Sequence, residues 1–244
     1  MFTGTGRDQA VRISNTELKA TSHRGVVRSY RHPGVNPLKS QLLRDYCNTG
    51  SLLDVGCGNG LYALSCQDRC PEVIQVDLED RRDPQASNFT FYAMNAEDLS
   101  LLNGPFDNII AFDIIEHLDD DVGFLKEAYR LLGSGGRLFL SVPNEDNSLL
   151  EKLNLAHIHF TDKTHRREYS YAGLKSILED GHFKNVKISP HINSSVVNIP
   201  QLLQKENTIS RYMAKFFKIQ MRCCEKIGIF ENRIIADWFA VVEK

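Results

Sequence analysis

The stretch LLDVGCGNG, Leu52 to Gly60, decides the fold of this 244-residue chain. A short apolar strand runs into three glycines at alternate positions, and we predict a helix after Gly60 that extends to about Asp68. Such glycines permit positive φ and let the backbone approach a ligand closely. The spacing is GxGxG and no Lys-Ser/Thr pair follows, which excludes a triphosphate-binding P-loop.

Short apolar strands and amphipathic helices alternate along the rest of the chain. We predict strands at 73–77, 89–94, 108–112, 137–142, 184–188 and 235–242, and helices at 119–132 and 171–178, the first ended by a glycine turn at 133–136. This alternation indicates a parallel sheet covered on both faces, hence a doubly wound α/β fold. Asp77 ends the second strand, where a carboxylate is placed to accept both hydroxyls of a ribose.

The composition is that of a globular chain with a sizeable core. Hydrophobic residues make up 42% and charged residues 25%, and the net charge is −2. These values argue against a disordered or fibrous protein and against a polyanion binder by bulk charge. The start lacks a signal-peptide pattern and no apolar run approaches about 18 residues, so we expect no membrane insertion. The six cysteines form no CxxC pair, and we expect reduced thiols and a cytoplasmic location.

The glycine stretch closely resembles the first motif of class I S-adenosylmethionine-dependent methyltransferases. Further resemblances follow in family order: Asp77, then NAEDLSL at 95–101, FDNIIAFDIIEHL at 106–118 and LLGSGGRLFLSVPN at 131–144. The resemblance spans about residues 50–190, and the last strand is similar to the seventh, antiparallel strand of the family. It implies a mostly parallel seven-stranded sheet of order 3-2-1-4-5-7-6 and S-adenosylmethionine as cofactor.

The resemblance also implies a division of the chain. We predict an N-terminal lid or substrate segment at 1–48, a cofactor-binding domain at 49–199 and 229–244, and an amphipathic helical insertion at 200–228. The insertion has an apolar stripe and, on another side of the helix, a basic face. The apolar stripe consists of Ile209, Met213, Phe216, Cys223 and Ile227. The basic face consists of Arg211, Lys215, Lys218 and Arg222. The basic face is a solvated surface or else a lid, a dimer contact or an anion-binding surface. Both a monomer and a homodimer are compatible with the sequence.

Ten residues correspond to the cofactor-binding positions of the family. The resemblance implies that the methionine part lies against the first motif, the ribose at Asp77, the adenine beside Leu78 and the 96–98 segment, and the methionine amine above Asp113. The cofactor carries an ammonium and a sulfonium, so carboxylates suit its crevice. An alternative role for Asp113 is a helix or turn cap. The full set is Asp54, Gly56, Gly58, Gly60, Asp77, Leu78, Ala96, Glu97, Asp98 and Asp113.

The acceptor side is rich in histidine, since five of the eight histidines lie between His117 and His182. The segment Asp113-x-x-Glu116-His117 resembles the acidic-His segment of quinone-biosynthesis O-methyltransferases and, more loosely, that of small-RNA 2′-O-methyltransferases. In those relatives the matching side chains bind a divalent metal, with a later histidine that His159 or His165 would supply here. Such ligands suit Mg²⁺, Mn²⁺, Fe²⁺ or Zn²⁺. In metal-free members Glu116 and His117 only shape the start of a helix.

Without a metal, His159 or His165 is the better general base, and His117 lies in the same loop cluster. Arg166 and Arg167 are candidates to orient an anionic acceptor, and Tyr30 is a candidate lid residue. We therefore expect an O-methyltransferase acting on a small metabolite such as a sugar, a phenol or a natural-product intermediate, anionic ones included. The alternatives are an RNA 2′-O-methyltransferase, which the acidic composition disfavours, and a non-catalytic cofactor-binding scaffold, which needs no histidine-rich acceptor side.

Overall fold

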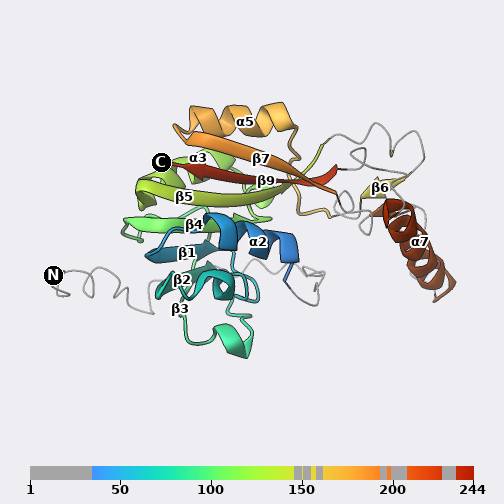
Figure 1. Cartoon of the computed structure of the whole chain (residues 1–244), viewed down its shortest axis with the longest axis horizontal. Coiled ribbons are helices and arrows are strands. Elements are labelled where there is room, and N and C mark those ends of the chain that lie inside the picture. The colour runs from blue at the N-terminus through green and yellow to red at the C-terminus, as the bar shows by residue number, and fades with distance from the viewer. Residues whose placement is uncertain are drawn as a thin grey trace.

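Seven strands lie in one sheet in the order β3-β2-β1-β4-β5-β9-β7 (Figure 1). Five strands are parallel to one another: β1 (Ser51–Val55), β2 (Glu72–Asp77), β3 (Thr90–Ala93), β4 (Phe106–Phe112) and β5 (Leu132–Pro143). The strand β9 (Ile235–Glu243) pairs antiparallel with β5 and with β7 (Lys184–Ile192). With β7 and β9 as the sixth and seventh strands of this sheet, this is the order 3-2-1-4-5-7-6. The predicted doubly wound α/β fold is confirmed.

The computed structural model describes residues 35–145, 150, 155–157, 162–192, 197–198, 208–226 and 235–244. Tyr30, His159 and residues 1–34 of the predicted lid segment lie outside these ranges. So do residues 200–207 and 227–228 of the predicted insertion. The proposed division of the chain into segments therefore stays a prediction.

Consecutive residues of the central strands face opposite layers, because side chains alternate along a strand. Leu52 belongs to one apolar cluster with Leu43 of α2 (Pro37–Tyr46). Leu53 belongs to another with Leu125 of α3 (Asp121–Leu131) and Leu174 of α5 (Tyr171–Asp180). Every residue of β1 is buried, as expected for a strand covered on both faces. In Figure 1, α2 lies in front of the sheet and α3 behind it.

The predicted helix after Gly60 is wrong. The segment forms turns around a short 3-10 helix, η1 (Ala63–Cys66), in which Ser65 N–H donates to the Tyr62 carbonyl at 2.9 Å. No side chain caps the start of η1, so its first turn has no extra stabilisation and closes with the tighter i to i+3 bonds.

The predicted glycine turn at 133–136 is also wrong, because β5 begins directly after α3. These residues extend β5 towards the chain end, where Lys244 N–H donates to the Gly136 carbonyl at 3.0 Å and Gly135 N–H donates to the Lys244 carbonyl at 3.2 Å. The helix itself starts at Asp121, after Asp120, whose carboxylate accepts from Gly123 N–H at 2.7 Å. Long-range pairing thus replaces the local turn that the glycines indicated.

The parallel strands end on the right of Figure 1, since the C-terminus at the end of antiparallel β9 is on the left. On the same side lie α7 (Thr208–Lys226) and β6 (Ala156–His157), which pairs with β8 (Val197–Asn198). Among the described residues, no helix has the length and apolar content required to cross a membrane.

Helix α7 packs on a different side from the one its sequence indicated. Phe217 and Met221 contact Leu150 and Leu155, and the Met221 side chain is 4% exposed. The predicted stripe residues Met213 and Phe216 are 53% and 63% exposed. Met213 and Phe216 of the predicted stripe are therefore not on the packed side of α7, because Leu150 and Leu155 contact the neighbouring side of the helix; the Ile209 side chain and Ile227 lie outside the described part of the chain.

Candidate active site

The glycine loop after β1 has the conformation that the motif requires. Gly56, Gly58 and Gly60 have φ values of +66°, +54° and +73°, which side chains disfavour. A Cβ on Gly56 would lie 1.8 Å from Cδ1 of Ile114, and one on Gly60 would lie 2.9 Å from Oε1 of Gln75. A Cβ on Gly58 would meet no atom within 4 Å. Packing therefore constrains Gly56 and Gly60, whereas Gly58 faces open space.

A buried carboxylate lies beneath this loop. Asp54 is 2% exposed, and Gln75 Nε2 donates to its Oδ2 at 3.0 Å and to the Gly60 carbonyl at 2.9 Å. Burial raises the pKa of Asp54 to about 7, and the charge of Asp77 adds to the effect. Gln75 was not predicted as a site residue, although an uncharged polar residue inside the apolar strand VIQVD was a usable signal.

Asp77 joins the glycine loop to the end of β2. Its two carboxylate oxygens accept from Gly58 N–H at 2.8 Å and from Leu78 N–H at 2.7 Å. The Leu78 side chain is 58% exposed beside it. The carboxylate is thereby fixed at the edge of the sheet, next to the open space at Gly58.

The carboxylates of the segment after β3 accept hydrogen bonds from other groups of the chain. Glu97 Oε1 accepts from Asp119 N–H at 2.5 Å and from Asp120 N–H at 3.4 Å. Asp98 accepts from the hydroxyl of Ser100 at 2.6 Å. Ala96 packs against the main apolar cluster. Glu97 therefore ties this segment to the residues before α3.

Asp113 follows β4 in a left-handed conformation, with φ +56°, and forms an ion pair. Its oxygens accept from Lys39 Nζ at 2.5 Å and from the Ser141 hydroxyl at 2.6 Å. Desolvation opposes both charges, but their attraction prevails, so the pKa of Lys39 is raised and that of Asp113 is lowered. Among the described residues its carboxylate accepts from side chains and caps no helix.

Lys39 reaches this position from α2 and is almost fully buried. Its ammonium lies 5.9, 5.3 and 5.7 Å from the ring centroids of Tyr62, Phe112 and Phe239, within the range of cation–π attraction. Lys39 was not predicted as a site residue, because nothing in its sequence neighbourhood distinguishes it from the five other Lys and Arg residues between positions 19 and 44.

Glu116 and His117 of η3 (Ile115–His117) meet His165, so that one ligand atom of each lies within 4.8 Å of the others. The two imidazole rings pack edge to face with centroids 4.7 Å apart, and Nδ1 of His117 lies 3.0 Å from the Thr164 hydroxyl. Glu116 is 1% exposed. Burial and then the charge of Asp113 raise its pKa well above the ordinary value. Burial and the nearby His117 lower the pKa of His165.

The donor atoms of Glu116, His117 and His165 are of the kinds that bind divalent cations. The trio offers a carboxylate oxygen and two imidazoles, and within the described residues Glu116 Oε2 is buried without a hydrogen-bond partner. Of the five predicted ligands the structure brings these three together. Asp113 lies outside the group because Lys39 and Ser141 hold it, and His159 is not among the described residues.

The two predicted substrate arginines bind the loop after β4. Arg166 Nε donates to the His117 carbonyl at 3.0 Å, and its guanidinium pairs with Asp119. Arg167 donates to the carbonyls of Leu118 at 3.1 Å and Asp119 at 2.9 Å and pairs with Asp121. Both guanidinium groups therefore hold the segment between η3 and α3 in place.

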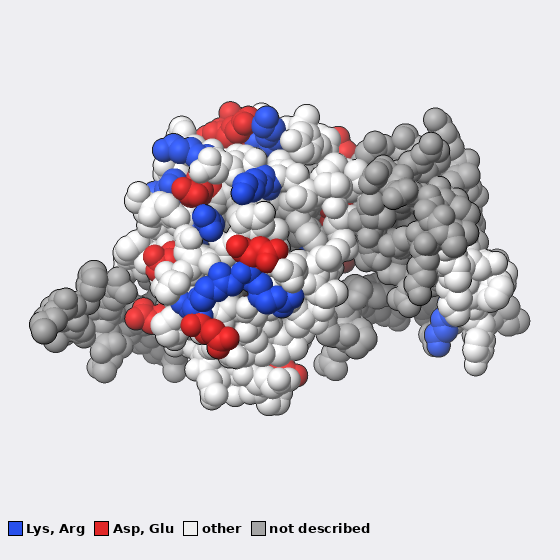
Figure 2. All heavy atoms as spheres, in the orientation of Figure 1, with Lys and Arg blue, Asp and Glu red and all other residues white. Residues whose placement is uncertain are grey.

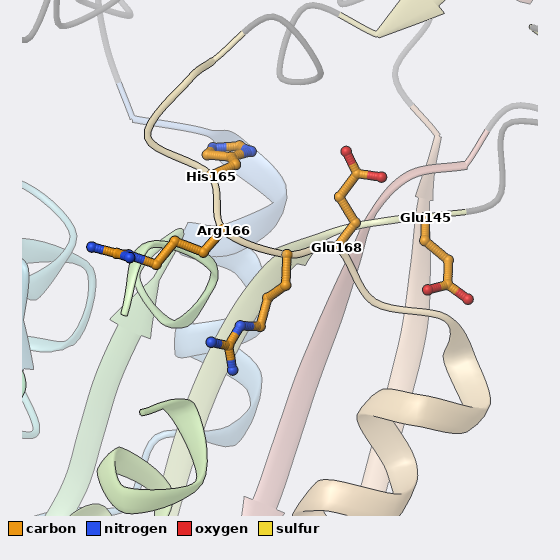
Figure 3. A pocket seen from close by; sticks show the side chains of 5 residues that line it. Glu145, His165, Arg166 and Glu168 are labelled. Carbon is orange, nitrogen blue, oxygen red and sulfur yellow. The ribbon is translucent and has the colours of Figure 1, made fainter. Parts of the chain in front are cut away.

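An open pocket of about 340 Å³ lies beside these residues (Figure 3). Figure 3 shows Arg166 pointing away from two carboxylates, those of Glu145 and Glu168. Burial, together with the charge of Glu145, raises the pKa of Glu168 to about 7. Glu168 belongs to the acceptor-side loop that the sequence indicated, whereas its proximity to Glu145 was not predicted, since the two residues are far apart in sequence and come from different loops. The pocket is lined by Glu145, His165, Arg166, Arg167 and Glu168.

A second missed pair joins β7 to β9. His191 Nδ1 lies 2.8 Å from Asp237 Oδ2, and the His191 ring stacks on Phe239 with centroids 4.6 Å apart. Phe239 is also one of the rings around the Lys39 ammonium. The dyad therefore adjoins the Lys39 and Asp113 ion pair. No linear signal connects two residues so far apart in sequence, and the predicted strand 184–188 ended before His191.

The chain matches the family described as methyltransferase domain over residues 28–188, and it belongs to this family. It is a class I S-adenosylmethionine-dependent methyltransferase domain, whose methyl donor is S-adenosylmethionine. Open α/β sheets bind ligands at the carboxyl ends of their strands, and the glycine loop and the carboxylates of Asp54, Asp77 and Asp113 lie at that edge.

Curated relatives share about 30% identity with parts of the chain. A probable S-adenosylmethionine-dependent methyltransferase of Mycobacterium tuberculosis is 29% identical over 157 residues, 60% of this chain and 53% of that protein. The mitochondrial ubiquinone biosynthesis O-methyltransferase of Candida albicans is 31% identical over 120 residues, 44% of this chain and 36% of that protein. The chain spans about half the length or less of these relatives.

Solved structures share the fold at lower identity. A SAM-dependent methyltransferase from Archaeoglobus fulgidus has a TM-score of 0.56 at 21% identity, over 86% of this chain and 95% of that one. The 1,6-didemethyltoxoflavin-N1-methyltransferase of Burkholderia thailandensis has a TM-score of 0.55 at 18% identity, over 86% and 77%. These likenesses support the fold.

Replacing Asp54 by asparagine should stabilise the protein without cofactor and flatten its pH dependence. The folded-state pKa of about 7 lies above the unfolded value of 3.8, so the proton on Asp54 stabilises the fold at low pH and this contribution is lost as the pH rises to 7. Asp54→Asn avoids the buried charge, while the new amide oxygen still accepts from Gln75. Thermal unfolding from pH 4 to 8 should show an advantage of the variant that grows up to about pH 7, on the order of a few kcal/mol.

The exposed carboxylate of Asp68 provides the control for this experiment. Asp68→Asn should give a pH profile parallel to that of the unaltered protein, because Asp68 is exposed. Parallel profiles for Asp54→Asn as well would contradict the assigned burial of Asp54.

Gly56→Ala and Gly58→Ala should separate folding from cofactor binding. The new methyl group at position 56 collides with Ile114, so this variant should lose stability. At position 58 it meets open space, with a backbone cost of about 1–2 kcal/mol, so this variant should fold. Calorimetric titration of Gly58→Ala with S-adenosylhomocysteine should show binding weakened about tenfold or more. Unchanged affinity would mean that the cofactor does not approach Gly58.

Proposed function

We propose that the protein transfers the methyl group of S-adenosylmethionine to a hydroxyl oxygen of a small metabolite. The observation that carries this proposal is the meeting of Glu116, His117 and His165 beside the cofactor crevice. An alcohol or phenol must lose its proton to become a good methyl acceptor, and this trio can accept a proton or hold a cation that acidifies the hydroxyl.

The cofactor side supports the same proposal. Asp54, Asp77 and Asp113 present carboxylates at the ends of three parallel strands, where open α/β sheets bind ligands. We assign Asp54 and the glycine loop to the methionine part, Asp77 to the ribose, and Leu78 with the 96–98 segment to the adenine. An ammonium and a sulfonium suit this acidic edge better than a phosphate would.

A divalent cation is part of the proposal. Glu116, His117 and His165 would hold it, and when bound it would lower the pKa of the acceptor hydroxyl. The unpartnered oxygen of Glu116 supports a cation here, because a buried carboxylate is otherwise costly.

The surrounding residues position the reacting groups. Thr164 orients the imidazole of His117, and Arg166 and Arg167 fix the loop that carries it. Without a bound cation, His165, which lines the pocket, is the candidate base that takes the acceptor proton. Holding the acceptor oxygen in line with the sulfonium methyl group supplies much of the rate enhancement.

A small acceptor is favoured over nucleic acid. Figure 2 shows Lys and Arg side chains intermixed with Asp and Glu on the described part of one face. The pocket itself combines two arginines with two carboxylates. Such mixed charge does not supply the continuous basic surface that a polyanion needs. The relative named for ubiquinone biosynthesis O-methylation supports an oxygen acceptor.

The proposal is tested with the intact protein, radiolabelled S-adenosylmethionine and pools of hydroxylated metabolites, with amines and RNA oligonucleotides as parallel arms. Methyl transfer to an oxygen, identified by mass spectrometry of the product, is the expected result. Transfer to nitrogen or to RNA alone would overturn the oxygen or the small-molecule part. Binding of S-adenosylhomocysteine with no transfer to any pool would favour a scaffold.

Glu116→Gln should abolish the binding of Mn²⁺, measured by calorimetry, and lower the transfer rate about a hundredfold or more. The amide keeps the shape of the side chain but removes the charge that attracts a cation. Glu179→Gln, at an exposed carboxylate of α5, should change neither quantity. If chelators and Glu116→Gln both leave the rate unaltered, the metal part of the proposal fails and the test moves to His165→Gln.

A further inference from the structure

Three thiols converge on the face of the sheet that α2 covers, near the edge where β2 begins. Cys47 caps the end of α2, Cys66 ends η1, and Cys70 lies just before β2. Their side chains are 4%, 2% and 1% exposed. The three Sγ atoms lie within 4.8 Å of one another, and those of Cys47 and Cys70 are 3.4 Å apart. This thiol cluster is separate from the cofactor loop, which follows the opposite end of β1.

The cluster is held by contacts from several elements. Asn108 Nδ2 of β4 lies 3.5 Å from Sγ of Cys70, and Arg69 donates to the Cys47 carbonyl at 2.9 Å. The positive charge of Arg69 acts on both Cys47 and Cys70. Leu43, Ala63 and other apolar residues pack around the sulfur atoms. The sulfur positions are thus set by the fold before any ligand binds.

The arrangement of the three sulfur atoms suits a soft metal ion with three ligands. Three sulfur atoms at about 2.3 Å from one ion in a plane lie about 4.0 Å apart, which compares with 3.4 Å between Cys47 and Cys70 and with an upper limit of 4.8 Å for all three pairs. In the described ranges no fourth His, Cys, Asp or Glu brings a ligand atom into this group. Zn²⁺ prefers four ligands, whereas Cu(I) is soft, favours thiolates and accepts three.

We propose that Cys47, Cys66 and Cys70 form a Cu(I) site. Binding forms three copper–sulfur bonds and releases three thiol protons, and copper stays in the +1 state. The complex carries a charge of −2, which the guanidinium of Arg69 and the amide of Asn108 partly offset. The ion joins the end of α2 to η1 and to the start of β2, so it stabilises the side of the fold from which Lys39 extends.

The test uses the full chain with Cys223→Ser and Cys224→Ser, because these neighbouring thiols on α7 offer a competing pair. Under anaerobic conditions the reduced protein is titrated with Cu(I) against a chromophoric chelator. We expect one ion per chain by native mass spectrometry and three sulfur neighbours by X-ray absorption. No retained copper in this background, or a Cys47–Cys70 disulfide in the anaerobic protein, would overturn the proposal.

Cys66→Ser in the same background removes one ligand with a small change in shape. Copper retention should fall by more than the ~10–100-fold that loss of a supporting contact costs. Cys57→Ser, at a buried thiol outside the cluster, should retain copper. Circular dichroism checks that both variants fold. If Cys66→Ser does not fold, the test is alkylation of the background protein, in which bound copper should protect three thiols. Equal retention in folded Cys66→Ser, or no protection, would exclude the site.

Discussion

The hydrogen bond from Gln75 to Asp54 is the contact on which the cofactor edge depends. It joins β1 to β2 in the interior, and the same amide holds the Gly60 carbonyl, so the loop cannot shift without exposing a buried carboxylate. Glycine is then required at positions 56 and 60, where a Cβ would collide with Ile114 and with Gln75. A buried carboxylate without an opposite charge beside it is unfavourable, and a neighbouring cation makes it favourable, which suits a site for a sulfonium cofactor.

Much of the fold could be predicted because its signals are local. Apolar runs give the strands, and this placed Asp54, Asp77 and Asp113 at the carboxyl ends of three strands, where the structure has them. The predictions were wrong where contacts with residues distant in sequence determine the local structure. Glycines 133–136 indicate a turn, yet pairing with the chain end makes them strand. The η1 segment has helical spacing but no cap, and α7 turns a different side to its partners.

The location of the candidate site was predicted better than the roles of its residues. Glu116, His117 and His165 meet as the motifs indicated. Arg166, Arg167 and Glu97 are near the site, but their bonds hold loop backbone. Sequence shows which polar groups approach the edge, whereas their hydrogen-bond partners depend on packing. For the same reason Lys39, the His191 and Asp237 dyad and the three gathered thiols had no linear signal, because each joins elements that are distant along the chain.

The ion pair between Lys39 and Asp113 makes α2 part of any equilibrium at this edge. A cationic ligand group that displaces Lys39 from Asp113 must break an ion pair whose ammonium three aromatic rings also surround. The measured dissociation constant of such a ligand therefore equals its intrinsic value divided by the fraction of molecules in which the pair is open. By reciprocity, an effector that opens the pair by shifting α2 raises the affinity of such a ligand by the same factor by which the ligand raises the affinity of the effector, so the helix and the crevice are thermodynamically coupled.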